Sequence, residues 1–295
     1  MKRYFLTFAN SDYDSEVLGR ITKEAEDLGL FDEIRALDES CFDASFASYW
    51  NGKLKGVRGY GYWVWKPYIL MKTLKEMNDG DTLLYADAGC RLNVKGKKRM
   101  LAYYKLLDKS PTGVIAFRQP EHHPFRNKKG KRRFMRNWYI ERKWVKGDMI
   151  DYFGIRERKD ILDTPQLLGG IFFLKKCAES VSLIKSIEDL YYSHYYLATD
   201  EPSVAPNFPD FEENRHDQAI FSVTFKKANA DILSSKELED EASIVNNHPI
   251  LALRCIANRG NDEPVEVMRK RLWKSYPCSF IKYLLRERNP RLLNR

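Results

Sequence analysis

The chain has 295 residues, 43% of them hydrophobic, which is enough for one large α/β domain or two small ones with a sizeable core. Its formal charge of +9 indicates anionic partners such as nucleotide diphosphates, anionic lipid headgroups or nucleic acid. No apolar run approaches the roughly 20 residues that span a bilayer, and the N-terminus turns polar too soon for a signal peptide, so we expect a cytoplasmic protein. The cysteines are dispersed and form no C-x-x-C pair, which argues against a disulfide framework and a structural zinc site.

The first 37 residues have the pattern of a β-α-β unit. Residues 2–9 are rich in aromatic and β-branched side chains and end in a polar turn, as a strand does. A helix follows from about residue 15 to residue 28, and Gly29 is well suited to end it. Residues 31–37 then predict a second, shorter strand. The next segment, residues 38–61, is irregular and aromatic and contains glycines that break any long helix.

A helix, a tight turn and a buried strand follow in residues 59–90. Apolar residues recur at helical spacings from residue 68 to residue 77, and Pro67 lies near the start, where its missing N–H costs nothing. Residues 82–86 are a nearly continuous apolar run, typical of a strand covered on both faces, and Asp87 comes directly after them. In open α/β sheets the carboxyl edge of the strands is where ligands bind.

The rest of the chain adds further strands and helices around two basic segments. We predict strands at residues 113–117, 168–174 and 230–234, and helices at residues 100–107, 176–195 and 219–226. Residues 91–99 read as a basic loop, and residues 200–214 as a long surface loop. Lys and Arg alternate with aromatic residues in residues 126–146 and again in the tail, residues 265–295.

Three of these segments together resemble a known family. They are LLYADAG at residues 83–89, QLLGGIFF at residues 166–173 and RHDQAIF at residues 215–221. In this order and separation they are similar to the motifs of GT-A class glycosyltransferases of the bacterial polysaccharide and lipopolysaccharide type, which use nucleotide sugars. The resemblance implies a GT-A-like mixed α/β sheet flanked by helices over residues 1–255, with a basic insertion at about 120–147. Residues 256–295 would then form a basic, helical C-terminal extension.

The resemblance implies transfer of a sugar, by a hexosyltransferase-like enzyme, from a nucleoside diphosphate sugar to a hydroxyl of a polysaccharide or lipid-linked glycan. The residues expected to contact the donor are Thr7, Asn10, Asp12, Tyr13, Lys66, Asp87, Gly169 and Gly170. Tyr13 would stack on the base, and Asn10 or Asp12 would bind the ribose or the base edge. Asp12 or Ser11 would alternatively only cap the helix that follows. The two glycines imply close backbone approach to a ligand or a bulge.

Asp217 and its neighbours are the expected acceptor side of the site. A carboxylate at a helix N-terminus stays ionised, so Asp217 would be the catalytic base on an acceptor hydroxyl, or would bond that hydroxyl if the reaction retains configuration. The alternative is that Asp217 simply caps the helix. His216, Gln218 and Asn214 are candidates for contact with the sugars.

Metal dependence is left open by the sequence. The family's Asp-x-Asp pair is reduced here to Asp87, Ala88 and Gly89, so the second carboxylate that would hold Mn²⁺ or Mg²⁺ is absent. Asp87 would bind such a cation with His248, if at all. Lys66 would take part of the cation's charge-neutralising role, unless it is an ordinary surface charge.

The basic, aromatic segments allow two kinds of partner. Residues 126–146 suit a single-stranded RNA surface or an anionic membrane with a lipid-linked acceptor, and the alternative is a solvated loop without a partner. The tail has the composition of an interfacial helix, which would place the enzyme peripherally on the inner face of the cell membrane, or of a helix packed on the core. For a glycosyltransferase we expect no nucleic acid partner. The alternative functions are a non-enzymatic RNA-binding protein and a nucleotidyltransferase. An early Gly-rich phosphate loop, which a nucleotidyltransferase would have, is missing.

Overall fold

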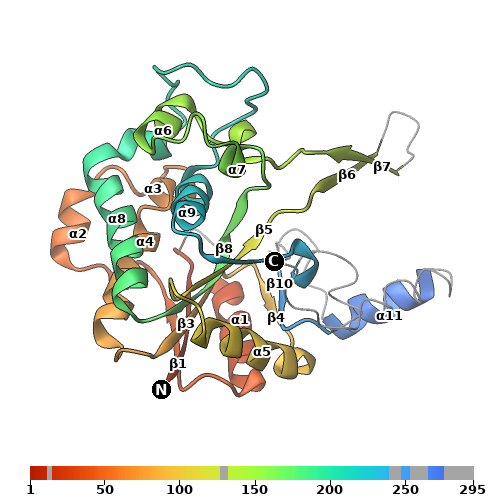
Figure 1. The fold of residues 1–295 in the computed structure, drawn as a ribbon. Coiled ribbons are helices and arrows are strands. Elements are labelled where there is room, and N and C mark those ends of the chain that lie inside the picture. The colour runs from red at the N-terminus through yellow and green to blue at the C-terminus, as the bar shows by residue number, and fades with distance from the viewer. Residues whose placement is uncertain (12–14, 127–131, 239–246, 253–264, 276–295) are drawn as a thin grey trace.

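A computed structural model describes residues 1–11, 15–126, 132–238, 247–252 and 265–275. Its centre is a six-stranded sheet in the order β2-β1-β3-β8-β5-β9 (Figure 1). The strands are β1 (Arg3–Phe8), β2 (Glu33–Leu37), β3 (Thr82–Ala86), β5 (Val114–Arg118), β8 (Leu167–Lys175) and β9 (Asp231–Leu233). β8 runs antiparallel to both of its neighbours, β3 and β5, whereas all other pairs in the sheet are parallel. The predicted α/β class with a mixed sheet is confirmed.

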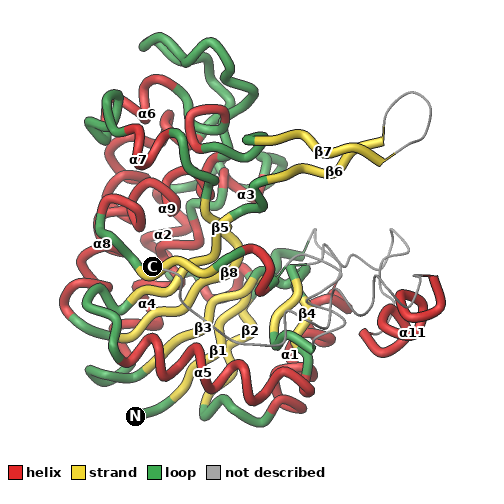
Figure 2. The backbone as a smooth tube through the Cα atoms, turned by 45° about the vertical axis from the view of Figure 1, so that its right-hand side comes forward, coloured by secondary structure: helices red, strands yellow, loops and turns green. Residues whose placement is uncertain are grey.

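Helices cover both faces of the sheet because the strand residues alternate between two apolar cores. Tyr4, Leu6 and Phe8 of β1 face one core, which they share with α2 (Ala44–Tyr49), α4 (Trp65–Glu76), α8 (Ala178–His194) and α9 (His216–Lys227). Phe5, between them, faces the second core, which includes α1 (Ser15–Leu28) and α5 (Lys97–Asp108). Figure 2 shows the strands between these two layers.

The predicted elements of the first 90 residues are found where the pattern placed them. β1 and β2 form the expected parallel β-α-β unit, and α1 ends at Leu28, before Gly29 with its positive φ of 58°. α4 begins at Trp65, so Pro67 lies in its first turn, where no N–H is needed. β3 is buried at all five positions.

Smaller elements lie in segments for which the sequence predicted no helix or strand. They are α2, in the segment 38–61 that was expected to be irregular, α3 (Gly59–Tyr62), α6 (Gly147–Tyr152), α7 (Lys159–Leu162), and the strand pair β4 (Arg91–Leu92) with β10 (Ile250–Leu251). The expected basic loop at residues 91–99 is therefore wrong in part: Arg91 is buried and its Nη1 donates to Glu24 Oε1 at 2.8 Å. The Arg91 guanidinium, which was expected in a solvent-exposed loop, is therefore paired with a carboxylate inside the molecule.

Two basic elements lie on the same side of the molecule. β6 (His122–Arg126) and β7 (Arg132–Arg136) form an antiparallel hairpin that projects away from the body (Figures 1 and 2). α11 (Val265–Ser275) belongs to the expected C-terminal extension, most of which lies outside the described residues. Within the described part of the chain, no helix combines the length and the apolar character that crossing a bilayer requires.

Candidate active site

A buried lysine lies at the centre of the site. Lys66, in the first turn of α4, is 1% exposed, and its Nζ donates a hydrogen bond to Asp217 Oδ2 at 2.5 Å. The same Nζ donates to the Gly169 carbonyl at 3.1 Å and lies 3.4 Å from Asp87 Oδ1. The interpretation of Lys66 as an ordinary surface charge is wrong, because the ammonium group is enclosed by two carboxylates and a carbonyl.

Asp87 is the member of this cluster that faces solvent. Its side chain is 44% exposed, compared with 8% for Asp217. The backbone N–H of Asp87 donates to Gly170 O at 2.8 Å, and the Tyr85 hydroxyl donates to Asp87 Oδ1 at 2.7 Å. One carboxylate oxygen is thus held by the protein, while the residue as a whole remains accessible to a ligand.

The turn that follows Asp87 is held from the other face of the sheet. Arg20 of α1 donates from Nη2 to Ala88 O at 2.7 Å and from Nη1 to Cys90 O at 2.8 Å. A planar guanidinium that binds two carbonyls of one turn restricts its backbone, so the position of Asp87 is fixed from both sides.

The protonation states of the cluster follow from burial and from the neighbouring charges. Burial works against the charged form of Lys66, but Asp217 and Asp87 outweigh it and raise the pKa of the ammonium group. Burial also raises the pKa of Asp217, against the effect of Lys66. Burial and then Asp87 raise the pKa of Tyr85 well above its usual value, so its hydroxyl remains a neutral donor.

The paired glycines allow protein segments to approach one another. A Cβ on Gly170 would lie 2.4 Å from Asp87 Oδ2, and a Cβ on Gly169 would lie 2.7 Å from Gln218 Cα. Of the two expectations, a bulge agrees with the register shift between β5 and β8 at these glycines, and the close neighbours are Asp87 and α9 of the chain itself. Their contact with a donor sugar stays a prediction.

Gln218 is oriented by a buried polar chain. Its Nε2 donates to Gln166 Oε1 at 2.6 Å, and Gln166 Nε2 donates to Glu141 Oε1 at 2.9 Å. Glu141 is fully buried, and its second oxygen accepts from Lys226 Nζ at 2.7 Å. The Nε2 group of Gln218 is directed toward Gln166, so its Oε1 is directed the other way, toward the backbone N–H of Gly169 at 3.5 Å.

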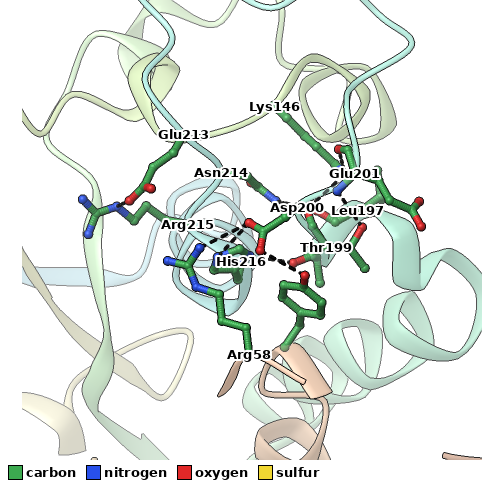
Figure 3. Close-up of polar contacts among 12 residues, drawn as sticks. Arg58, Lys146, Leu197, Thr199, Asp200, Glu201, Glu213, Asn214, Arg215 and His216 are labelled. Atoms are coloured by element: carbon green, nitrogen blue, oxygen red, sulfur yellow. Dashed lines mark hydrogen bonds and ion pairs between the residues drawn. The ribbon is translucent and has the colours of Figure 1, made fainter. Parts of the chain in front are cut away.

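His216 and Asn214 belong to a second polar group beside this cluster, shown in Figure 3. Asn214 is buried and donates to the carbonyls of Leu197 at 2.9 Å and Thr199 at 3.3 Å, so it holds the loop that precedes it. His216 is buried, its Nδ1 lies 2.7 Å from Ala198 O, and its Nε2 lies 3.6 Å from Asp200 Oδ1. The predicted acceptor residues thus divide into one that faces the Lys66 cluster, Gln218, and two that do not.

The remaining predicted residues lie apart from the cluster or outside the described part. Asp12 and Tyr13 are outside the described residues. Thr7 is fully buried, and its hydroxyl has no hydrogen-bond partner among the described residues. Asn10 is half-buried after the end of β1. Their contact with a nucleotide stays a prediction.

The donor set does not fit a divalent cation held by the protein alone. His248 Nδ1 lies 3.1 Å from Glu237 O, and no hydrogen bond or ion pair of the described residues links His248 to Asp87. No group of three or more His, Cys, Asp or Glu side chains suited to a metal occurs in the described part. Asp87 offers one carboxylate whose Oδ1 lies near an ammonium group, whereas Mg²⁺ and Mn²⁺ prefer several oxygen ligands.

Two residues that contact the predicted site residues, Tyr85 and Asp200, were not predicted from the sequence. Tyr85 lies near the end of β3 and Asp87 directly follows that strand, two positions on, so strand alternation continued by one residue puts both side chains on one face. Asp200 lies in an acidic loop where nothing in the pattern distinguishes it from its neighbours. Tyr85 could therefore have been predicted from the sequence pattern, whereas Asp200 could not.

Comparison with known proteins gives distant structural likenesses. No protein-family model matches the chain, and no curated protein sequence matches it. Among solved structures, the chain is similar to a glycosyltransferase involved in the glycosylation of the major capsid of PBCV-1, with TM-score 0.46 and 10% identity over 90% of this chain and 100% of that chain. It is similar to the galactosyltransferase LgtC in complex with donor and acceptor sugar analogs, with TM-score 0.41 and 10% identity over 97% and 100%. It is also similar to 4-diphosphocytidyl-2C-methyl-D-erythritol synthase from Anaerococcus prevotii DSM 20548, with TM-score 0.31 and 9% identity over 77% and 98%. All three TM-scores lie below 0.5, and we draw the function from the site.

Proposed function

We propose that this protein is a glycosyltransferase that moves a sugar, most simply a hexose, from a nucleoside diphosphate sugar to a hydroxyl of a polysaccharide or lipid-linked glycan. The observation that carries the proposal is the ion cluster in which Lys66 joins Asp87 to Asp217 at the carboxyl edge of β3. Ligands of open α/β sheets bind at this edge. The three segments whose motifs resemble the GT-A class contribute to this one cluster.

Asp87 is assigned to the donor. A carboxylate accepts hydrogen bonds from ribose or sugar hydroxyls, and these charge-assisted bonds are stronger than neutral ones. Because Tyr85 and Lys66 fix one side of the carboxylate, little orientational freedom is lost when the donor binds. If Mn²⁺ or Mg²⁺ accompanies the donor, Asp87 is the side chain that would contact it, and the cation would neutralise the charge of the diphosphate.

Asp217 is assigned to the acceptor. In an inverting reaction the acceptor oxygen forms a bond to the anomeric carbon, the bond from that carbon to the diphosphate oxygen breaks, and the electron pair leaves with the diphosphate. The hydroxyl proton goes to Asp217, whose pKa is raised by burial toward the range in which a general base works best. In a retaining reaction Asp217 would bond the hydroxyl instead.

Lys66 is assigned an electrostatic role. Its ammonium group is too enclosed to move toward a ligand, so it acts on the reaction through its field and through the position that it gives to both carboxylates. A fixed charge in a water-poor site acts more strongly on developing negative charge than the same charge in solvent.

The projecting hairpin supports an anionic, membrane-linked acceptor. Lys146, at the end of the basic segment, is buried, so the basic charge that a membrane could meet comes from the hairpin, whose β7 has the sequence RRFMR. Such a segment is attracted to anionic lipid headgroups by roughly 1 kcal/mol for each Lys or Arg near the surface. Peripheral binding to the inner face of the membrane would bring the enzyme to a lipid-linked glycan.

Donor binding tests the proposal directly. A thermal-shift titration with UDP-, GDP-, dTDP- and ADP-sugars, each with and without Mn²⁺, is expected to identify one donor that raises the melting temperature, and to report the metal requirement at the same time. Stabilisation of about 2.7 kcal/mol is expected at a hundredfold excess over Kd.

Asp87→Ala is expected to abolish this shift and sugar transfer while leaving the unliganded melting temperature close to that of the wild type. Asp163→Ala is the matched control, since Asp163 is 45% exposed and ion-paired, compared with 44% for Asp87. A panel in which no nucleotide sugar binds, or an Asp87→Ala variant that binds as well as the control, would overturn the proposal.

A further inference from the structure

His216 presents a buried nitrogen that lacks a hydrogen-bond donor. A carbonyl oxygen only accepts, so the contact of 2.7 Å between Nδ1 and Ala198 O places the proton of a neutral ring on Nδ1. Nε2 is then an acceptor. It is fully buried, and no donor among the described residues reaches it. A buried acceptor without a partner is costly, which calls for a group that donates to it.

The charged group beside this nitrogen is a second acceptor. Asp200 Oδ1 lies 3.6 Å from Nε2, while Asp200 itself is held by Tyr62, whose hydroxyl donates to Oδ2 at 3.0 Å, and by Arg58 at 3.3 Å. Figure 3 shows Asp200 and His216 directed toward one another, with Arg58 beside them. Two acceptors that face each other leave a position for hydrogen-bond donors between or beside them.

The backbone around this position is strained. Tyr62, Trp63 and His216 have φ values of 50°, 60° and 53°, in the left-handed region that non-glycine residues avoid. The three side chains pack together: the His216 ring lies 5.1 Å from that of Tyr62 and is stacked 5.6 Å from that of Trp63. Strain of this kind persists where the surrounding structure enforces it, and it gathers at binding and active sites.

The chemistry of the pair selects its ligand. An anion would meet the Asp200 carboxylate, an ammonium group would meet Arg58, and an apolar group would leave Nε2 unpaired. Neutral donors remain, and they are hydroxyl groups in a surrounding of aromatic rings, which also pack against the C–H faces of sugars.

We propose that Asp200 and His216 bind two hydroxyl groups of the acceptor sugar, one donating to Asp200 Oδ1 and the other to His216 Nε2. This assignment rests on the proposed glycosyl transfer and names the acceptor subsite of that reaction. Burial lowers the pKa of His216, and Arg58 lowers it further against the raising effects of the Ala198 carbonyl, Asp200 and Glu213, in keeping with a neutral ring at neutral pH.

The test observes the histidine itself. In long-range ¹H–¹⁵N NMR spectra of the full chain, His216 is assigned by the signal lost in His216→Gln, and the free protein is expected to show the neutral ring with its proton on Nδ1. Methyl glycosides of glucose, galactose, mannose and N-acetylglucosamine are then titrated. At least one is expected to shift the Nε2 signal in a saturable way.

Two variants with matched surroundings make the test specific. Asp200→Asn supplies its own N–H to Nε2 and is expected to weaken glycoside binding about tenfold or more without lowering the melting temperature. Asp151→Asn is the control, since Asp151 is 48% exposed and paired with Arg156, as Asp200 is 50% exposed and paired with Arg58. It is expected to bind glycosides like the wild type.

Three results would overturn the inference: a free protein whose His216 carries protons on both nitrogens, a panel in which no glycoside shifts the signal, or an Asp200→Asn variant that binds as the control does. Nucleotide-sugar binding without glycoside binding would overturn this subsite alone. Glycoside binding without nucleotide-sugar binding would instead overturn the proposed transfer reaction.

Discussion

At the scale of single residues, the site depends on one enclosed ammonium group. Charged side chains are almost never fully buried unless they are paired, and Lys66 is paired with a carboxylate 151 positions away in the chain. Its pairing neutralises Asp217, which has little contact with solvent of its own. Removal of Lys66 would leave the buried Asp217 carboxylate without its partner, and removal of Asp217 would leave Lys66 with Asp87 alone.

Lys66→Met tests this dependence. The variant keeps the volume and removes the ammonium group, so we expect it to lower the free energy of unfolding in urea by about 3–5 kcal/mol. Lys66→Met combined with Asp217→Asn removes both charges and is expected to recover part of that loss. Lys23→Met, at an exposed i,i+4 pair with Asp27, should change stability by no more than about 0.5 kcal/mol. A Lys66→Met variant as stable as this control would contradict the buried pair.

The sequence predicted some of these residues and not their state. The resemblance to the GT-A motifs brought Asp87, Gly169, Asp217 and Gln218 to one place, and the structure brings them together. The burial of Lys66 could not be predicted from the local sequence pattern, because its partner, Asp217, comes from a helix far away in the chain. Likewise, that Gly170 makes room for Asp87 follows from the pairing of β3 with β8, which no local motif encodes.

At the scale of elements, the segment before α4 has a conformation that ordinary propensities oppose. Residues 59–63 all have positive φ values, including the non-glycine residues Tyr60, Tyr62 and Trp63. The glycines of this segment predicted a break in helical structure, which is correct, but a left-handed turn in three aromatic residues contradicts their intrinsic preference. Tertiary contacts such as the hydrogen bond from Tyr191 to the Tyr62 carbonyl at 2.8 Å overrule it.

Two glycines near this turn allow the energetic cost of a left-handed backbone to be measured separately from the cost of overpacking. Gly61 has φ of 88°, and an added Cβ would lie 2.8 Å from Leu54 Cδ2 and 2.9 Å from Lys53 O. Gly52 has φ of 74° and open space at the same position. We expect Gly52→Ala to cost about 1–2 kcal/mol for the left-handed conformation alone, and Gly61→Ala to cost a further 1–3 kcal/mol or so for overpacking. Equal losses in urea unfolding would mean that the turn is not packed as described.

At the scale of the whole molecule, the strands of the central sheet were predicted from the sequence, but the position of β8 within the sheet was not. Residues 82–86 and 168–174 both read as buried strands from their apolar runs, and both are. Their antiparallel pairing, and the position of β8 between β3 and β5, depend on contacts across the entire fold, which a single sequence does not display. The basic hairpin was expected as an insertion, but its strands were not.

Two buried histidines make the stability of the whole molecule sensitive to acid. Burial lowers the pKa values of His216 and His248 from the ordinary 6.5. The unfolded chain therefore binds protons at these sites before the folded chain does. Their contribution to stability is fully present above pH 6.5 and is lost as pH falls from there toward the lower folded-state values.

We expect the free energy of unfolding to fall between pH 7.5 and pH 5.5 by up to about 1.4 kcal/mol per pH unit for each histidine. Urea titrations at both pH values measure the slope, and His216→Gln combined with His248→Gln should flatten it. An unchanged slope in the double variant would assign the acid sensitivity to other groups.

The origin of the three charged residues in separate parts of the chain has a consequence for assembly. Lys66 and Asp87 come from the first third of the polypeptide and Asp217 from the last third, so no contiguous fragment that stops before α9 contains the buried pair of Lys66 with Asp217. During synthesis Lys66 has Asp87 as its one carboxylate neighbour among these three residues until the carboxyl-terminal helix supplies Asp217. A protein split between Asp87 and Asp217 would separate Asp217 from Lys66, and only reassociation of the two halves would restore that buried pair.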